Sequence, residues 1–591
     1  MAFGERGSER AAGPGVRARP VLFGLLLLAV AGCASCARLA DSAKNKFTGF
    51  ATKRADKAAY KIVRAKQEEA LGKAADFSIG SLTGGAADRL LSQAQRLDLA
   101  QDSYTTPTSL IPLSDALAIA VSNNPDYRVR KEALYTAALG LTEVRREYQP
   151  LFDAGGKLGA TRQRTGDLTG KENVEWFGTR GLSAGANWLL ATGARVSLDF
   201  SHSFVRFFTH EPRPSSTNGL AFAITQPLLR GAGTLVAGES LVQGERNMIY
   251  AVRDFRRYQQ GFIIQVAGEY YALLSAQDQL RNARSNCRSA LYNQSKLERY
   301  ASGGKASEIE VDQARQKVFE AEVGLSRTRK DYGRRLDNFK VTLGLPIDVD
   351  VGPDPKELDR LAERGLLRPN MTLGDAIRTA QDERLDLKNR KDAVEDSRRA
   401  VRIALRNFLP NLSAGYSYST STGEKGDSFK LDLKNNTHSW WLDLGLPFDW
   451  TPRRNDFRRA SIGLNQSQRS LDLFRDQLVL EVRDAWRELE ESRVDYRIQL
   501  QSVRLAERRV AMTSRMLQRE ASLTARDLLE AEDALLASRN ALTDALIRHT
   551  LQRLRFWNAI ERLEIDSAGL WASQQDESAE SPQEPATGTK P

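Results

Sequence analysis

The chain has 591 residues, enough for several domains with large buried cores. Its mean hydropathy of −0.46 argues against a protein built from membrane-spanning helices. Lysine and arginine outnumber aspartate and glutamate by 86 to 75, but this surplus is spread along the chain. Nucleic-acid binding would need a basic stripe, so no nucleic-acid partner is expected. The three cysteines, Cys33, Cys36 and Cys287, are too few for a disulfide framework or a metal cluster.

Residues 1–32 are expected to be a signal peptide. Four arginines precede the apolar run VLFGLLLLAVAG (21–32), which is short for a membrane span. The run ends in VAGC, where small residues precede Cys33, and this resembles a bacterial lipobox. We therefore predict cleavage before Cys33 and a diacylglycerol anchor on its thiol, with Cys36 as a weaker second site and an ordinary secretory signal as the alternative. Ala34 follows, and in the lipoprotein pattern the absence of Asp there implies sorting to the outer membrane. Beyond this anchor we expect no cofactor.

Residues 33–108 form an N-terminal extension that contains one expected helix, DKAAYKIVRAKQEEALG, and could tether the lipid to a first repeat. This first repeat covers 109–352. Its strands are expected within about 151–227, where apolar residues alternate with small or polar ones, as at Phe152, Ala154 and Leu158. A further candidate hairpin at 182–200 either adds two membrane strands or makes an extracellular hairpin.

Residues 228–345 contain no proline and are rich in Ala, Leu, Arg, Glu and Gln, which favour helices. From Pro227 there is room for a helix of ~70 residues, about 105 Å long. Gly303 and Gly304 mark the turn of a long helical hairpin, and EVDQARQKVFEAEV begins its return helix.

After a linker at 353–370, residues 371–566 repeat the same order. The opening LGDAIRTAQDERLDLKNRKDA (373–393) shares eight identities with LSDALAIAVSNNPDYRVRKEA (113–133). Strands are expected within about 411–449 and a second helical hairpin at 453–566. Its first helix carries a coiled-coil seam at steps of three or four residues, formed by Leu471, Phe474, Leu478, Val482, Ala485, Leu489, Ser492, Tyr496, Gln499 and Val503. The tail 567–591 is polar and expected to be disordered.

Matched prolines show where the two copies differ in length. Pro150 and Pro410 lie 260 apart, whereas Pro227 and Pro447 lie 220 apart. The 40 extra residues of the first copy therefore all fall between its two prolines, in the strand region.

Strands of about ten residues with one apolar and one small, polar face are typical of outer-membrane barrels. A soluble sheet with one buried face is the alternative. Each chain offers four such strands, or six with the extra hairpin, but a closed barrel needs about eight or more. Several copies of the chain must then close the barrel, because an open sheet edge is not tolerated in lipid.

The order of elements over roughly 109–566 resembles the TolC family of outer-membrane efflux proteins, here as a lipoprotein. The resemblance implies an α+β membrane protein: a homotrimer whose porin-like barrel receives four strands from each chain, 12 in all, and continues as a periplasmic coiled-coil tunnel. It implies a periplasmic adaptor and an inner-membrane transporter as partners, and passive export of drugs, metals or proteins by efflux or type I secretion. The expected location is the bacterial outer membrane, with the helices in the periplasm.

The family keeps its working residues at the hairpin tips, where a glycine precedes an acidic residue by six positions. Gly304 and Glu310 have this spacing. In the second copy Ala521 replaces the glycine and precedes Asp527 and Glu530. The resemblance implies a periplasmic gate formed by an acidic ring of Asp527, Glu530 and Glu310; the alternative is solvated acids that complement a helix dipole.

The same resemblance places adaptor docking at the two tips, on Ser302, Gly303, Gly304, Lys305, Ala521 and Ser522. One departure concerns the closed state, because Leu523 and Gln518 stand where the family uses an arginine and a tyrosine.

No enzyme is expected. Gly181-Leu-Ser183-Ala-Gly185 fits G-x-S-x-G, but it falls within an alternating strand, whereas a nucleophile elbow needs a sharp strand-to-helix turn. The competing hypothesis is a lipid-anchored periplasmic coiled-coil scaffold with a soluble head and no pore.

Overall fold

The structure is a computed structural model that describes residues 48, 50–75, 77–79, 109–166, 172–207, 214–304, 306–425, 433–519, 525–564 and 577–579. The chain divides into two units, residues 1–61 and 62–591. The first unit contains the beginning of a helix that covers residues 50–71. Cys33 and the expected signal peptide lie outside the described residues. The second unit contains both repeats.

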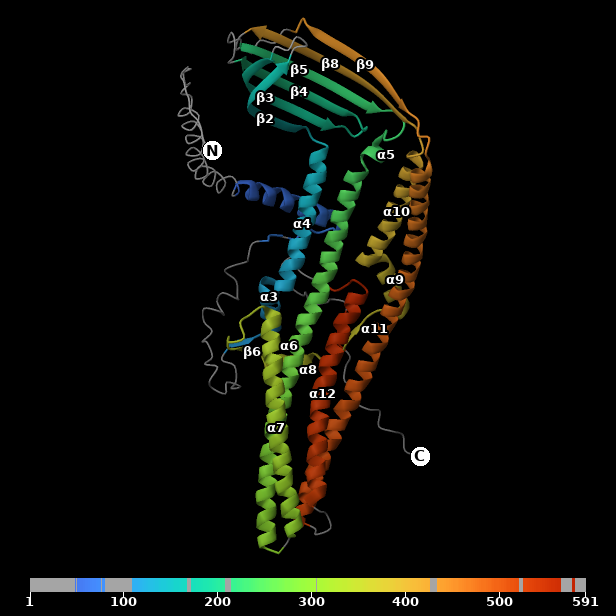
Figure 1. Ribbon diagram of the computed structural model, residues 1–591. Coiled ribbons are helices and arrows are strands. Elements are labelled where there is room, and N and C mark those ends of the chain that lie inside the picture. Colours follow the sequence, from blue (N-terminus) through green and yellow to red (C-terminus); the bar gives the residue numbers. More distant parts are fainter. Residues whose placement is uncertain are drawn as a thin grey trace, which may run out of the picture. The chain divides into compact units, whose positions relative to one another are not determined.

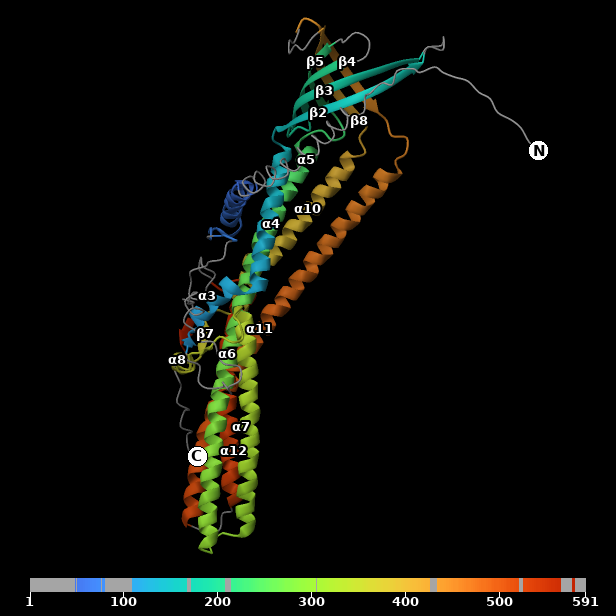
Figure 2. The ribbon, with the colours of Figure 1, turned by 60° about the vertical axis from the view of Figure 1, so that its left-hand side comes forward.

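A six-stranded antiparallel sheet lies at one end of this second unit, and the long helices extend away from it (Figures 1 and 2). The strand order is β2-β3-β4-β5-β8-β9, so the two repeats meet where β5 pairs with β8. The strands are β2 (Leu151–Gly166), β3 (Glu172–Leu189), β4 (Arg195–Phe207), β5 (Pro214–Pro227), β8 (Asn411–Lys425) and β9 (Asn436–Gly445).

Each repeat opens with two helices that lead to its first strand. The pair α3 (Leu113–Asn123) and α4 (Pro125–Glu147) in the first repeat corresponds to α9 (Leu373–Glu383) and α10 (Leu385–Arg406) in the second. Asn124 ends α3 and also starts α4, because its side chain accepts a hydrogen bond from Tyr127 N and proline occupies the first helical position. Thr372 forms a capping box with Asp375 at the start of α9.

Each repeat also carries a long helical hairpin, as predicted. The first consists of α6 (Glu239–Ser302) and α7 (Glu308–Leu343), and the second of α11 (Thr451–Arg519) and α12 (Ala525–Ala559). The expected ~70-residue helix from Pro227 is interrupted, because Gly231 and Gly233 have positive φ and only the short α5 (Thr234–Ala237) precedes α6. Figure 2 shows α10 and α11 running side by side away from the sheet.

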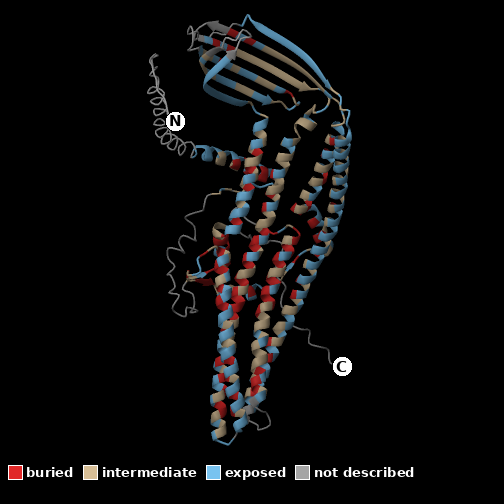
Figure 3. Ribbon diagram, viewed as in Figure 1, coloured by how far each residue is buried: buried red, intermediate tan, exposed pale blue. Residues whose placement is uncertain are grey.

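Apolar contacts hold each hairpin together. All ten predicted seam residues of α11 are buried or half-buried, from Leu471 to Val503. In the first hairpin, small residues of α6 and α7 form a narrow core that lets the helices approach closely: Cys287, Ala290, Val318 and Ala321. Figure 3 shows buried positions along the helices, whereas the sheet carries mainly exposed and half-buried ones.

Short strands join the segments around the repeats. The strand β1 (Ser109–Ile111) pairs in parallel with β6 (Val351–Pro353). The expected linker contains α8 (Lys356–Arg364) and β7 (Leu367–Pro369). The tail was expected to be disordered, but its residues Glu577–Ala579 form the strand β10, which pairs with β7. This pairing uses backbone hydrogen bonds, which do not require apolar side chains.

The end of the N-terminal extension packs on the first repeat. Lys66 lies 3.0 Å from Glu245 of α6, which also pairs with Arg145 of α4 at 2.8 Å. Phe77 makes an edge-on ring contact with Phe255 at 6.4 Å. These contacts therefore hold the parts of the extension around Lys66 and Phe77 against α4 and α6. Across the helices that the structure describes, none combines the length and apolar composition of a bilayer span.

Candidate functional site

One face of the six-stranded sheet carries apolar side chains on every strand, together with a few polar ones such as the hydrogen-bonded pair His202 and Asn218. The antiparallel register places even-numbered residues opposite even-numbered residues in all five strand pairs. In the single chain many of these side chains are exposed; Leu158, for example, has 82% of its surface accessible and Trp440 has 73%. The apolar members of this face are Phe152, Ala154, Leu158, Ala160, Leu182, Ala184, Ala186, Trp188, Val196, Leu198, Phe200, Phe204, Leu220, Phe222, Ile224, Leu412, Ala414, Tyr416, Tyr418, Trp440, Leu442 and Leu444.

The opposite face consists mainly of small and polar residues at odd-numbered positions. Its one large side chain near the centre of β9 is Trp441, whose indole ring covers Gly415 so closely that a Cβ there would lie 2.1 Å from it. Glycine is therefore required at 415. Typical members of this polar face are Gly155, Lys157, Gly159, Gly181, Ser183, Gly185, Ser197, Asp199, Ser201, Thr217, Gly219, Ser413, Ser417, Ser419, Ser439 and Asp443.

Ser183 of the G-x-S-x-G sequence lies in the middle of β3, opposite Gly155 and Ser201. This place has no strand-to-helix turn, so the geometry of a nucleophile elbow is absent there. The described residues hold no group of His, Cys, Asp and Glu side chains that could bind a metal.

The two outer strands of the sheet, β2 and β9, each pair on one side only among the described residues. Both present long rows of backbone N–H and C=O groups, and β2 is 16 residues long. Because unpaired backbone groups cannot remain exposed in lipid, these edges need strand partners if the apolar face contacts a bilayer.

The tip of the first hairpin is a tight turn between α6 and α7. Ser302 ends α6, and Gly304 follows with a φ of 71°, which favours glycine. Ser307 caps α7, and the Glu310 carboxylate accepts hydrogen bonds from its backbone N at 2.8 Å and its Oγ at 3.1 Å. Glu310 therefore has a capping function that fixes the turn. Lys305 lies outside the described residues.

The second tip is described only in part. Ala521, Ser522 and Leu523 lie outside the described residues. Asp527 lies in the first turn of α12, where its charge complements the helix dipole. Glu530, at 63% side-chain exposure, pairs with Arg509 of α11 at 3.1 Å.

Polar contacts join the two hairpins near their tips. Lys317 of α7 lies 2.5 Å from Asp533 of α12, and Asn293 of α6 donates to Glu532 of α12 at 2.8 Å. Burial raises the pKa of Glu532, although the hydrogen bond from Asn293 opposes this. Further from the tips, Thr543 of α12 donates to a carboxylate of α6. We call these contacts the lower inter-repeat seam.

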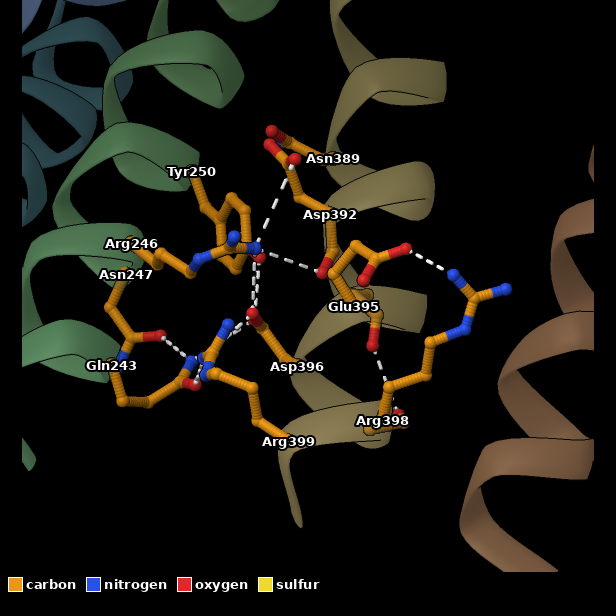
Figure 4. A network of polar contacts seen from close by, with 12 residues as sticks. Gln243, Arg246, Asn247, Tyr250, Asn389, Asp392, Glu395, Asp396, Arg398 and Arg399 are labelled. Carbon is orange, nitrogen blue, oxygen red and sulfur yellow. Dashed lines mark hydrogen bonds and ion pairs between the residues drawn. The ribbon is translucent and has the colours of Figure 1, made fainter. Parts of the chain in front are cut away.

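A second polar seam connects α6 of the first repeat with α10 of the second (Figure 4). Arg246 pairs with Asp396 at 2.8 Å, and Arg253 pairs with Asp392 at 2.6 Å. The Tyr250 hydroxyl donates to Asp396 at 2.5 Å. We call these contacts the upper inter-repeat seam. They fix the two repeats in register next to the sheet.

The upper seam predicts a pH dependence. Burial, together with the hydrogen bond to Asp396, raises the pKa of Tyr250 from 10.0 to about 12. Between these values the unfolded chain loses a proton that the folded chain keeps, so the free energy of unfolding should fall as pH rises through this window. We expect a shallower fall for Tyr250→Phe, measured by urea unfolding in detergent at several pH values. Tyr292→Phe, which removes an exposed hydroxyl, is the control; equal slopes for Tyr250→Phe and wild type would contradict the assignment.

Comparison with known proteins identifies the fold. No family model matches the sequence. The alkaline protease secretion protein AprF of Pseudomonas aeruginosa is 27% identical over 341 residues, which cover 56% of this chain and 66% of AprF. The solved structure of CusC superposes with a TM-score of 0.55 at 15% identity, covering 79% of this chain and 96% of CusC. The CmeC outer membrane channel of Campylobacter jejuni gives 0.55 at 13% identity, covering 82% and 96%.

The chain has the fold of the TolC-family outer-membrane channels. The MtrE outer membrane channel of Neisseria gonorrhoeae agrees, with a TM-score of 0.54 at 16% identity over 76% of this chain and 88% of MtrE. The resemblance predicted from the sequence is therefore confirmed, and the relatives are channel and secretion proteins.

Sequence reasoning did not identify the residues that join the repeats. Lys317 and the upper seam around Asp396 had no motif to mark them, because their partners lie on other elements. A comparison of the two repeats offered one signal for these contacts, because α10 aligns with α4 at an offset of 260. The polar residues of α10 that face α6 differ from their counterparts on α4.

Proposed function

We propose that the protein is an outer-membrane channel of a tripartite efflux or type I secretion system, which passively conducts its cargo from a periplasmic pump assembly to the exterior. The observation that carries this proposal is the sheet, whose even-numbered face carries apolar side chains on all six strands while its other face is mainly small and polar. Such a sheet suits a wall between lipid and a water-filled lumen. The bacterial outer membrane is the corresponding location, with Cys33 as its lipid anchor.

The names of the relatives support export as the activity. AprF is a protein of alkaline protease secretion, and CmeC and MtrE are outer membrane channels. The matched region spans 66% of AprF, so the cargo class and the pump are part of the proposal. An inner-membrane transporter and a periplasmic adaptor would dock at the helical tips, where Ser302, Gly303 and Gly304 form the described turn.

A homotrimer closes the channel. The repeat predicts its interface, because α6 packs between α4 and α10, whereas among the described helices its counterpart α11 packs mainly against α9, α10 and α12, all of its own repeat. Arg253 of α6 corresponds to Leu473 of α11 at the repeat offset of 220, and Asn389 of α10 corresponds to Val129 of α4 at the offset of 260. The contact between Arg253 and Asn389 within the chain therefore has an expected counterpart between Leu473 and Val129. Both are apolar and exposed, at 59% and 60%. A contact between α11 of one copy and α4 of the next would bury them.

This interface predicts a cross-link between copies. In a chain with Val129→Cys and Leu473→Cys, a short bismaleimide should join neighbouring copies into dimers and trimers on a denaturing gel. The matched control, Arg253→Cys with Asn389→Cys, should be cross-linked within one chain, so that it still migrates as a monomer on the denaturing gel. Monomers alone from the first variant, in a preparation whose control reacts, would contradict the interface.

The acidic pair of the second tip acts as the ring at the tunnel entrance. Three copies of Asp527 and Glu530 would gather carboxylates around one axis and favour cations. We expect Asp527→Ala/Glu530→Ala to lower the cation-to-anion permeability ratio several-fold in planar bilayers. Asp472→Ala/Asp484→Ala removes two exposed acids far from the tip and should change little. An unchanged ratio in the tip variant would discard the ring and keep the channel.

Single-channel recording in planar bilayers tests the proposal as a whole. The purified oligomer should give discrete openings. A protein that stays in aqueous solution after removal of its acyl chains, and that forms no pore, would instead favour the lipid-anchored scaffold. The TolC fold and the apolar sheet face argue against that alternative, since a soluble head would expose large side chains such as Trp440 to water.

A further inference from the structure

We propose that the inserted strands β3 and β4 belong to the transmembrane wall, so that three chains close a barrel of 18 strands rather than 12. The count follows from six strands in each chain taken three times. This inference rests on the proposed trimeric channel and concerns its width. It would make the barrel lumen about one and a half times as wide as a 12-stranded one, since barrel diameter grows roughly linearly with strand number.

The pairing of the strands is the first argument. The strand β3 pairs with β2 from Leu151↔Asn187 to Gly166↔Glu172, along the full length of β2. The strand β4 pairs with β5 from Arg195↔Thr225 to Arg206↔Pro214. A hairpin projecting above a 12-stranded barrel would leave β2 and β5 as direct neighbours. Here they are separated by two complete strands.

The length and chemistry of the inserted strands are the second argument. A tilted strand needs about 9–11 residues to span a bilayer. The strand β3 has 18 residues and β4 has 13, so both are long enough. Their even-numbered face is as apolar as that of the common strands. Leu198 of β4, for example, lies in one cross-strand row with Phe222 of β5 and Tyr418 of β8.

The polar face of the inserted strands is the third argument. Small and polar residues occupy it: Gly181, Ser183, Gly185, Ser197, Asp199, Ser201 and Ser203. Gly185 lies between Asp153 and Asp199, and a Cβ at Gly185 would come within 2.7 Å of an Asp153 carboxylate oxygen. Such a face suits water, and the wider lumen that it lines would admit large hydrated solutes, leaving size selection to the helical end of the passage.

Cysteine labelling of the oligomer in lipid vesicles tests the wall directly. Leu198→Cys and Ser197→Cys lie on opposite faces of β4, and Tyr418→Cys and Ser417→Cys lie in the same rows on β8, a strand of the common architecture. If β4 is in the wall, a water-soluble maleimide should label both serine positions at least tenfold faster than Leu198→Cys and Tyr418→Cys. The parent chain carries Cys287→Ala.

The outcomes separate this inference from the proposed function. Fast labelling of Leu198→Cys together with slow labelling of Tyr418→Cys would overturn the 18-stranded wall and leave a 12-stranded channel. Fast labelling at both would overturn the membrane barrel itself.

The width is tested by polymer exclusion in single-channel recordings. Deletion of residues 167–206 removes the inserted pair and leaves β2 and β5 antiparallel. The wild-type channel should admit larger polyethylene glycols from the outer side than the deletion variant does. Equal size limits would overturn the wider lumen. If the variant does not assemble, a count of strands in an electron cryomicroscopy cross-section of the wild-type trimer decides between 18 and 12.

Discussion

Replacement of Phe222 by arginine is expected to abolish stable assembly of the protein in membranes. Phe222 lies midway along the apolar stretch of the central strand β5 and makes a ring contact with Tyr416 at 6.3 Å. A charge facing lipid near the middle of a bilayer costs about 2–4 kcal/mol in outer-membrane barrels. Loss of the aromatic contact adds about 0.5–1.5 kcal/mol, and a trimer carries both costs three times. The yield of heat-resistant oligomer after refolding into liposomes is the measurement.

The neighbouring residue provides the matched control. Ala223 lies on the polar face of β5, between Ser197 and Ser417, so Ala223→Arg would place the same charge in the lumen. We expect this variant to assemble and to shift the permeability toward anions. Equal loss of oligomer in both variants would contradict the assignment of the two faces.

Replacement of Arg384 by alanine is expected to produce the largest loss of stability among the helices. Arg384 is 4% exposed and lies 2.8 Å from Glu481 and 3.0 Å from Asp386, and it also donates to Ala559 O at 2.9 Å. It thereby joins the start of α10, the middle of α11 and the end of α12. Its removal would leave Glu481 and Asp386 with only their longer ion pairs to Arg257, at 3.6 and 3.7 Å, and would take away the buried donor to Ala559 O, at a cost of about 1–3 kcal/mol. The midpoint of urea unfolding in detergent should fall accordingly.

Arg378→Ala is the matched control for this prediction. Arg378 lies one helix earlier, its side chain is 81% exposed, and its carboxylate partner Asp375 is 3.9 Å away. An exposed pair of this kind contributes about 0–1 kcal/mol. Similar unfolding midpoints for Arg384→Ala and Arg378→Ala would show that the network at Arg384 does not hold the helices together.

The sequence predicts the periodic elements of the fold well. A strand period of two marks the apolar face, as at Leu412, Tyr416 and Tyr418, because successive side chains point to opposite faces. A helical period marks the seam of α11, where Leu478, Val482 and Leu489 are buried. Matched prolines in the two repeats locate the ends of the strand regions.

The contacts between elements could not be predicted in the same way. Arg246 and Asp396 are 150 residues apart, and neither belongs to a periodic pattern that would indicate its partner. The order of strands in the sheet is also a tertiary property: alternation assigns faces to β3 and β4 but does not say which strands they pair with. Capping by Glu310 follows from the serine three positions before it, a signal that is independent of the spacing from Gly304 on which its expected place in the gate rests.

The contrast between the apolar hairpins and the polar seams has a consequence for how the chain acquires its structure. The interface between α6 and α7 joins residues near in sequence, so its contacts have low contact order and should form early, hairpin by hairpin. The ion pairs of the upper seam join residues 139 and 150 apart, and the lower seam adds Thr543 with Asp278, 265 apart. Docking of the two halves would then be a late, salt-sensitive step, because concentrated electrolyte screens charge pairs and leaves hydrophobic packing intact.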